Sequence, residues 1–153
     1  MAKKEAEAPV RDPKTFKLKV TVGPTISLED QCRLLGVEYV LDSSRLGEWP
    51  DKKAFKRPEM PYEICVQDGK DNVGKSFDKV RLAPNERRPS ALEGLAVFPK
   101  TPDILDDHGL ILTGTTVGPY DVVILHKVKG KIRMEPYSVT FVDEKAGIVT
   151  CSR

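Results

Sequence analysis

The chain has 153 residues, of which 31% are charged and 39% hydrophobic, and its formal net charge at pH 7 is +2. This length fits one domain better than two, and this balance of residues excludes a disordered chain. A net charge this small does not by itself indicate nucleic-acid binding. We therefore expect a single folded domain whose function has to be read from local patterns.

The compartment follows from what the sequence lacks. Residues 1–9 have no apolar core, so they do not form a secretory signal, and no apolar run approaches the roughly 20 residues that span a bilayer. Cys32, Cys65 and Cys151 are odd in number and far apart, which argues against a disulfide framework and a zinc site. We expect reduced thiols, a cytoplasmic location, no membrane partner, no metal and no cofactor.

The first part of the chain reads as a tail followed by a strand. Residues 1–14 are polar and alternate in charge, which predicts a flexible tail before a single domain over residues 15–153. From Phe16 to Val22 apolar residues alternate with polar ones, a pattern typical of a strand with one buried face. Gly23 and Pro24 end this strand.

Helix starts are predicted where a Ser or Thr is followed by an acidic residue three positions later or by a proline. These starts lie at Ser27, Ser90 and Thr101. The first helix is expected to run from Leu28 to Leu35 and to end at Gly36. A further short helix is expected over Ser76–Leu82, and one helical turn in the lysine-rich stretch 51–57.

Strands dominate the second half of the prediction. The expected strands after the first are Val37–Leu41, Tyr62–Gln67, Leu110–Leu112, Val122–Leu125, Ile132–Met134, Val139–Val142 and Ile148–Cys151. The turns between the later strands are short, which favours antiparallel pairing because a parallel crossover needs a dozen or more residues. The fold class is therefore α+β, with a mostly antiparallel sheet, a β-rich C-terminal half and two or three short helices.

One string matches the phosphate-binding P-loop pattern G-x-x-x-x-G-K-[ST]. It runs from Gly69 through Gly74 and Lys75 to Ser76, after a predicted strand and before a predicted helix. In such a loop backbone amides hold phosphates, the lysine reaches the terminal phosphates and the hydroxyl binds Mg²⁺. The β-rich second half does not offer the parallel βαβ units that this motif needs. We therefore favour a structural loop and keep Mg-nucleotide binding as an alternative.

A second candidate site is a basic hairpin. Lys127, Lys129, Lys131 and Arg133 alternate around Gly130, which would place four positive charges on one face. Such a face could contact the phosphates of a nucleic acid, but lysines also protect the edge strands of soluble sheets. No aromatic residues accompany the lysines, so we favour the protected edge without excluding nucleic acid. Residues that could extend the patch are Arg87, Arg88, Lys52, Lys53, Lys56 and Arg57.

Acidic residues and a histidine gather at Asp103, Asp106, Asp107 and His108. They could serve in acid–base chemistry or bind a metal, but no second cluster completes such a site. Charges at the two ends of a helix explain them adequately. The single tryptophan, Trp49, is expected to anchor a loop onto the core.

The residues from Arg88 to Ala96 read Arg-Pro-Ser-Ala-Leu-Glu-Gly-Leu-Ala, and Pro61 and Tyr62 enter a predicted strand. This arrangement resembles a bacterial domain-of-unknown-function family, uncharacterised conserved proteins whose members carry Arg-x-Leu-Thr-x-x-Glu-Gly-(Ile/Leu)-Ala and end near Ala-Ser-Cys. The resemblance covers residues 60–153, and here Pro89 and Ser90 replace Leu-Thr. It implies a bacterial protein without assigning any catalytic residue, and it implies no phosphate-binding loop.

No set of residues converges on a reactive constellation. We therefore expect a non-enzymatic binding or structural module that engages a protein partner. The alternatives are Mg-nucleotide binding at Gly69–Ser76 and nucleic-acid binding at Lys127–Arg133.

Overall fold

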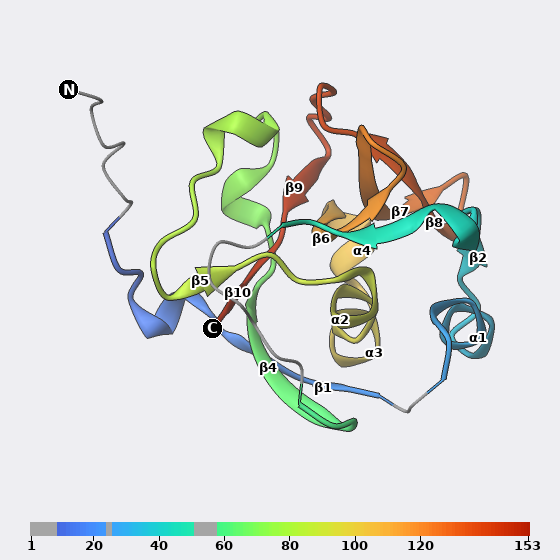
Figure 1. Cartoon of the computed structure of the whole chain (residues 1–153), viewed down its shortest axis with the longest axis horizontal. Coiled ribbons are helices and arrows are strands. Elements are labelled where there is room, and N and C mark those ends of the chain that lie inside the picture. Colours follow the sequence, from blue (N-terminus) through green and yellow to red (C-terminus); the bar gives the residue numbers. More distant parts are fainter. Residues whose placement is uncertain (1–8, 24–25, 51–57) are drawn as a thin grey trace.

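A computed structural model describes residues 9–23, 26–50 and 58–153 and confirms the α+β class (Figure 1). The strands are β1 (Leu18–Val22), β2 (Glu38–Tyr39), β3 (Leu46–Glu48), β4 (Tyr62–Gln67), β5 (Glu86–Arg87), β6 (Gly109–Val117), β7 (Asp121–Val128), β8 (Lys131–Ser138), β9 (Ala146–Ile148) and β10 (Thr150–Ser152). The helices are α1 (Leu28–Leu34), α2 (Ala91–Leu95), α3 (Val97–Lys100) and α4 (Ile104–Asp107). Only Ala96 separates α2 from α3, so the two form one interrupted helix.

The smaller sheet is antiparallel and has the strand order β1-β4-β10-β5. Its first strand forms where the alternating pattern predicts it, with Val20 and Val22 buried and Lys19 and Thr21 exposed. Strand β4 has the limits predicted from the sequence and lies between β1 and β10. The sheet therefore joins segments from both halves of the chain.

The larger sheet has the order β2-β8-β7-β6-β3, and β9 also pairs with β6. Strands β6, β7 and β8 form the predicted antiparallel meander. Pairing is parallel at two short places, β2 with β8 and β9 with β6. The other pairings of the described strands are antiparallel, which confirms the prediction of a mostly antiparallel sheet. Strand β6 is long enough for β3 and β9 to share its outer edge, at opposite ends.

The predicted strand over Val139–Val142 is wrong. The backbone N–H groups of Thr140 and Phe141 donate to the hydroxyl and carbonyl oxygens of Ser138, at 3.3 and 3.1 Å. These local hydrogen bonds turn the chain where a strand would have continued, as serine commonly does. Phe141 and Val142 are consequently exposed.

The interrupted helix α2–α3 packs between the two sheets, near the centre of the view in Figure 1. The main core joins apolar side chains of both sheets to Cys32 of α1 and Leu95 of α2. A smaller core lies on the other face of the larger sheet, around Ile111 and Ile124. Gly94 brings α2 close to β6, because a Cβ atom there would meet the Leu112 side chain at 2.1 Å.

The end of the predicted tail makes specific contacts. Arg11 donates from its backbone N–H to Asn85 Oδ1 at 3.0 Å and from Nε to Glu86 Oε1 at 3.2 Å. Pro13–Thr15 then form a short 3₁₀ turn. Contacts with the body of the fold thus begin before residue 15. The rest of the tail, residues 1–8, and the helical turn predicted in the stretch 51–57 lie outside the described residues.

Candidate functional site

The P-loop-like string folds as a tight loop in which most backbone N–H groups already donate hydrogen bonds within the protein. Its amides that donate to acceptors within the protein are those of Gly69, Lys70, Asn72, Val73, Gly74 and Lys75. Ser76 Oγ donates to Asp78 Oδ1 at 2.6 Å, and a 3₁₀ turn at Phe77–Lys79 stands where a helix was predicted. The preceding strand, β4, has antiparallel neighbours. These contacts argue against a phosphate cradle at Gly69–Ser76.

Titration with Mg-ATP or Mg-GTP is therefore expected to give no saturable binding for the wild-type chain or for Lys75→Ala. The physical reason is that the amides that would hold a phosphate already donate within the fold. Isothermal titration calorimetry on both proteins checks this. Saturable binding that the variant loses would restore the nucleotide site.

The basic hairpin exists, but its charges do not share a face. Lys129 and Gly130 have φ of 50° and 79°, which makes a tight two-residue turn between β7 and β8. In this register Lys127 pairs with Ile132 and Val128 with Lys131, so Lys127 points to the opposite face from Lys131 and Arg133. The prediction of four charges on one face is wrong.

Two of the hairpin's cations also have acidic partners. Lys127 Nζ lies 2.6 Å from Asp106 Oδ1, and Arg133 lies 3.5 Å from both Glu38 and Glu135. Of the residues that might extend the patch, Arg87 is buried, and the lysines and arginine of the stretch 51–57 lie outside the described residues. The positive charge of the hairpin is thus partly neutralised, and both of its strands lie inside the larger sheet.

The acidic cluster lies around the short helix α4, and its buried residue is His108. His108 follows α4 and is 4% exposed. Its Nδ1 lies 2.7 Å from Asp107 Oδ2, and its Nε2 lies 2.8 Å from the backbone oxygen of Asp68. The hydrogen bond from His108 and the charge of Lys70 hold the pKa of the Asp107 carboxyl below its usual value. Within the described ranges, no group of His, Cys and acidic side chains is arranged to hold a metal ion.

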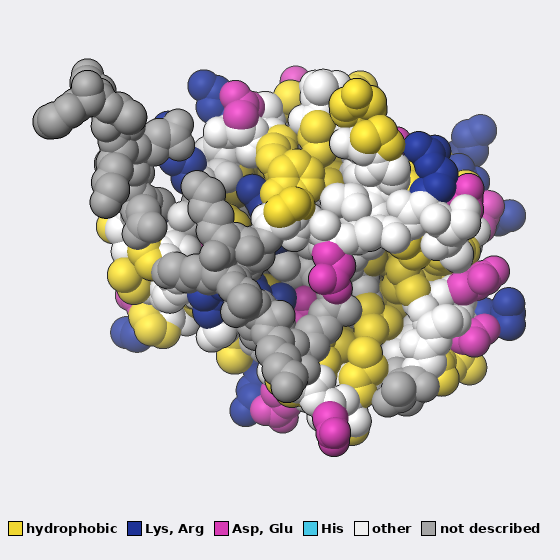
Figure 2. All heavy atoms as spheres, viewed as in Figure 1, with side chains coloured by type: hydrophobic (Ala, Val, Ile, Leu, Met, Phe, Trp, Pro, Cys, Tyr) yellow, Lys and Arg dark blue, Asp and Glu magenta, His cyan; other side chains and the backbone are white. Residues whose placement is uncertain are grey.

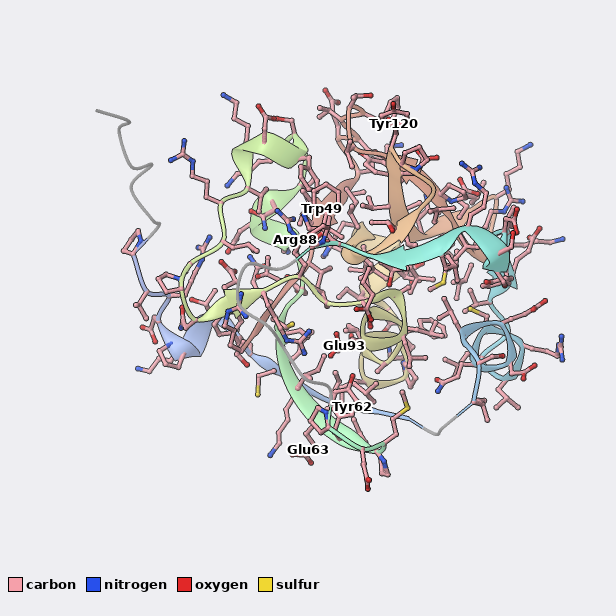
Figure 3. The ribbon with its side chains drawn as sticks, viewed as in Figure 1. Trp49, Tyr62, Glu63, Arg88, Glu93 and Tyr120 are labelled. Atoms are coloured by element: carbon pink, nitrogen blue, oxygen red, sulfur yellow. The ribbon has the colours of Figure 1, made fainter. Side chains whose placement is uncertain are left out.

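A buried ion pair occupies the segment that carries the family resemblance. Arg87 donates from Nη1 and Nη2 to the two carboxylate oxygens of Glu93, at 2.8 and 2.6 Å. The Tyr62 hydroxyl donates to the same carboxylate at 3.1 Å. Figure 3 shows the side chains of Tyr62 and Glu93 side by side, with Glu63 pointing away. Glu93 also completes the predicted capping box with Ser90.

Electrostatics keep Glu93 ionised inside the core. Burial acts to raise the pKa of its carboxyl, but hydrogen bonds and charge from Arg87 outweigh burial and lower the pKa below its usual value. Each partner's side chain is almost fully buried, so neither faces a substrate. We conclude that this pair is structural, a contact that the sequence did not reveal.

An aromatic end of the molecule was also missed by the sequence. It consists of Tyr120, Tyr137, Phe141 and Val142, and we name this set the aromatic end. Tyr120, Phe141 and Val142 are 75%, 58% and 45% exposed. The rings of Tyr137 and Phe141 meet edge to face with centroids 5.8 Å apart, and Val139 N–H donates to Tyr120 O at 3.2 Å.

Figure 2 shows apolar side chains running over one face towards this end. Trp49 lies nearer the centre, as Figure 3 shows, and its ring packs against that of Phe77 at a tilt of 46° with centroids 4.8 Å apart. The Arg88 guanidinium lies 4.5 Å from the Phe77 centroid and donates to Thr113 Oγ1 at 3.1 Å. Trp49 thus packs on the smaller core, and Figure 3 places it between Arg88 and the region of Tyr120.

The three cysteines are free thiols. Cys32 and Cys151 are buried, and Cys65 is half-buried. Burial raises the pKa of Cys32 to about 11 and that of Cys151 to about 12, so both thiols stay protonated at neutral pH.

Comparison with known proteins finds no matching family model, no matching curated protein and no matching solved structure. In the part of the chain that the structure describes, no helix combines the length and apolar character needed to cross a membrane. The fold and the surface therefore carry the functional argument alone.

Proposed function

We propose that the chain is a non-enzymatic binding module that docks onto a protein partner through the aromatic end. One observation carries this proposal: three large apolar side chains, at Tyr120, Phe141 and Val142, are exposed together where β7 begins and β8 ends. Exposed apolar patches of this kind mark interaction surfaces, and aromatic residues are enriched at their centres.

The charges around the aromatic end favour a protein over a nucleic acid or an anionic membrane. Asp121 follows Tyr120 directly. Burial raises the pKa of the Tyr137 hydroxyl above its usual value, and the nearby negative charge of Asp143 raises it further. These carboxylates would repel phosphates. The basic turn at Lys129 lies at the far end of β7, roughly 23 Å away at 3.3 Å per residue.

The compartment proposed with this function is the cytoplasm, and its proposed source is bacterial. The free thiols of Cys32, Cys65 and Cys151 support a reducing environment. The bacterial source is supported only by the resemblance of residues 60–153.

Tyr120→Ser is expected to weaken partner binding at least about tenfold, because an exposed tyrosine at the centre of an interface commonly contributes more than 1 kcal/mol. Its stability should change by no more than about 0.5 kcal/mol, since the side chain is 75% exposed. Leu34→Ser is the matched control, because Leu34 is 74% exposed on the distant α1.

The partner is to be captured with a photoreactive phenylalanine analogue at position 120, and with the same analogue at position 34. We expect adducts with a protein only from position 120, and competition of that adduct by unlabelled wild type but not by Tyr120→Ser. An adduct between two copies of the chain would identify a second copy as the partner. Equal adducts from both positions, or none from position 120, would reject the proposal.

A further inference from the structure

Strand β1 forms one outer edge of the smaller sheet, and among the described strands it pairs only with β4 (Figure 1). In an antiparallel pair, every second residue turns its backbone N–H and C=O groups towards the neighbouring strand, and the residues between turn theirs away. The outer side of β1 therefore presents backbone donors and acceptors that β4 does not use.

The register of the smaller sheet decides which backbone groups face which strand. Arg153 lies one residue beyond the pairs of β10 with β5, and its N–H donates to Asn85 O at 3.0 Å. Hydrogen-bonded and non-hydrogen-bonded pairs alternate along an antiparallel ladder. Cys151 therefore turns its backbone groups towards β5, and Thr150 turns its own towards Gln67 of β4.

The same alternation carries the pattern across β4 to β1. Since Gln67 faces β10, Val66 faces β1, where it pairs with Leu18. Leu18 and every second residue after it thus face β4, whereas the backbone groups of Lys19 and Thr21 face outwards. Both residues are exposed, and outside the β1–β4 ladder none of the backbone hydrogen bonds among the described residues involves them.

The two faces beside this open edge differ in character. On the solvent face Lys17 and Lys19 are exposed, and only Lys19 has an acidic partner among the described residues, Glu63 at 3.0 Å. On the core face Leu18 is half-buried and, with Ile104, lines an open hollow of about 490 Å³. A strand added to this edge would place alternate side chains on these two faces. Acidic side chains fit the first face, and apolar side chains fit the second.

We propose that β1 is a docking edge for an extended segment of another protein, in which acidic and apolar side chains alternate. The segment adds to the smaller sheet beside β1, and its backbone bonds to the outward groups of Lys19 and Thr21, a known mode of peptide recognition. Two copies of the chain paired at this edge would bring their lysines together, which favours a partner of opposite charge. This surface does not depend on the aromatic end, which belongs to the larger sheet.

Amide hydrogen exchange of the full chain, followed by NMR, tests the edge with an octapeptide of four Glu-Val repeats as the probe. In the chain alone we expect the amides of Lys19 and Thr21 to exchange fast and that of Val20 to be protected. At a peptide concentration ten times the Kd, about one tenth of the chain is free, so exchange at Lys19 and Thr21 should slow about tenfold.

Matched peptides separate strand addition from loose attraction. Residues opposite Lys19 and Thr21 share their face, so the backbone groups of the glutamates point towards β1 and those of the valines point away. Methylation of the glutamate nitrogens should therefore abolish the slowing, and methylation of the valine nitrogens should not. Four Lys-Val repeats should not bind, because their charge repels Lys17 and Lys19.

Two variants keep the test independent of folding. Thr21→Pro removes an outward N–H that β4 does not use, in an edge strand where proline is tolerated, and should abolish binding of the Glu-Val peptide. Lys19→Glu should exchange the preference, weakening the Glu-Val peptide and admitting the Lys-Val peptide, which a general loss of structure would not produce. Unchanged preference in Lys19→Glu would overturn the selection of acidic segments.

The remaining outcomes each overturn the proposal. Exchange at Lys19 and Thr21 that the Glu-Val peptide does not slow, or that both methylated peptides slow equally, would mean that no strand is added. Slow exchange of these two amides in the chain alone would show that the edge is already covered. If that slowing grew with the concentration of the chain, the occupant would be a second copy.

Discussion

Replacing Glu93 by Leu is expected to lower the free energy of unfolding by about 3–5 kcal/mol, because it removes the carboxylate that makes a bidentate ion pair with the buried guanidinium of Arg87. Arg87 and Glu93 side chains are 4% and 1% exposed, and the pair is bidentate. Removal of the carboxylate also takes away acceptors for Tyr62 and for the Ser90 amide. Urea denaturation followed by circular dichroism measures the loss.

The control for this prediction is an ion pair of similar length on the surface. Lys19 Nζ lies 3.0 Å from Glu63 Oε2, with side chains 67% and 58% exposed. Exposed pairs of this kind contribute about 0–1 kcal/mol, so Glu63→Gln should change stability by no more than that. Equal losses in the two variants would contradict the role assigned to burial.

A double variant separates the contribution of the Arg87–Glu93 ion pair to stability from the cost of leaving one of its two charges buried without the other. Arg87→Met with Glu93→Leu is expected to be more stable than Glu93→Leu alone, because the buried guanidinium that has lost the Glu93 carboxylate is no longer present. Recovery should be incomplete, since Tyr62 and Ser90 still lack their acceptor. A double variant that loses the sum of both single effects would show that Arg87 and Glu93 act independently.

Gly147→Ala is expected to destabilise the protein by about 1–3 kcal/mol or more, through overpacking of the loop at Gly69 against β9. A Cβ atom at Gly147 would meet the Gly69 backbone oxygen at 1.9 Å, and backbone cannot rotate away as a side chain can. Thermal and urea unfolding measure the loss. Exchange of the amides in residues 69–74 should speed up as well, because the loop has to move.

Gly47→Ala is the matched control for this substitution. Its Cβ atom would approach only the Thr116 hydroxyl oxygen, at 2.8 Å, and that side chain can rotate. The substitution also reduces the freedom of the unfolded chain, so its net effect should lie within about 1 kcal/mol of zero. A loss at Gly47 as large as that at Gly147 would mean that the close approach of the two backbones is not the cause.

The sequence predicts local features well where a few neighbouring residues decide them. Strand β4 begins and ends as predicted, and Ser90 caps α2 as its spacing to Glu93 indicates. The bond from Glu93 to Arg87 could not be predicted, because it depends on where β5 lies. That position is set by pairing with Cys151, 64 residues further along the chain.

The aromatic end was missed because apolar residues in a turn look like a strand. Phe141 and Val142 follow a β-branched run, which favours a strand, and only the hydrogen bonds of Ser138 reveal the turn. The faces of the basic hairpin could have been predicted. A two-residue turn at Lys129 and Gly130 pairs Val128 with Lys131, and these two residues share a face of the hairpin. Lys127 is the next residue along the strand from Val128, so it points to the opposite face from Lys131.

The position of β10 between β4 and β5 has a consequence for synthesis on the ribosome. Until residues 150–152 emerge, the inner edge of β4 at Val66 and Gln67 has no partner, although β1 is already in place. A nascent chain that stops short of this point displays an open strand edge, and such edges invite pairing with other chains. Thr150 pairs with Gln67, 83 residues earlier in the chain, so closure of the smaller sheet depends on a long-range contact of the kind that slows folding.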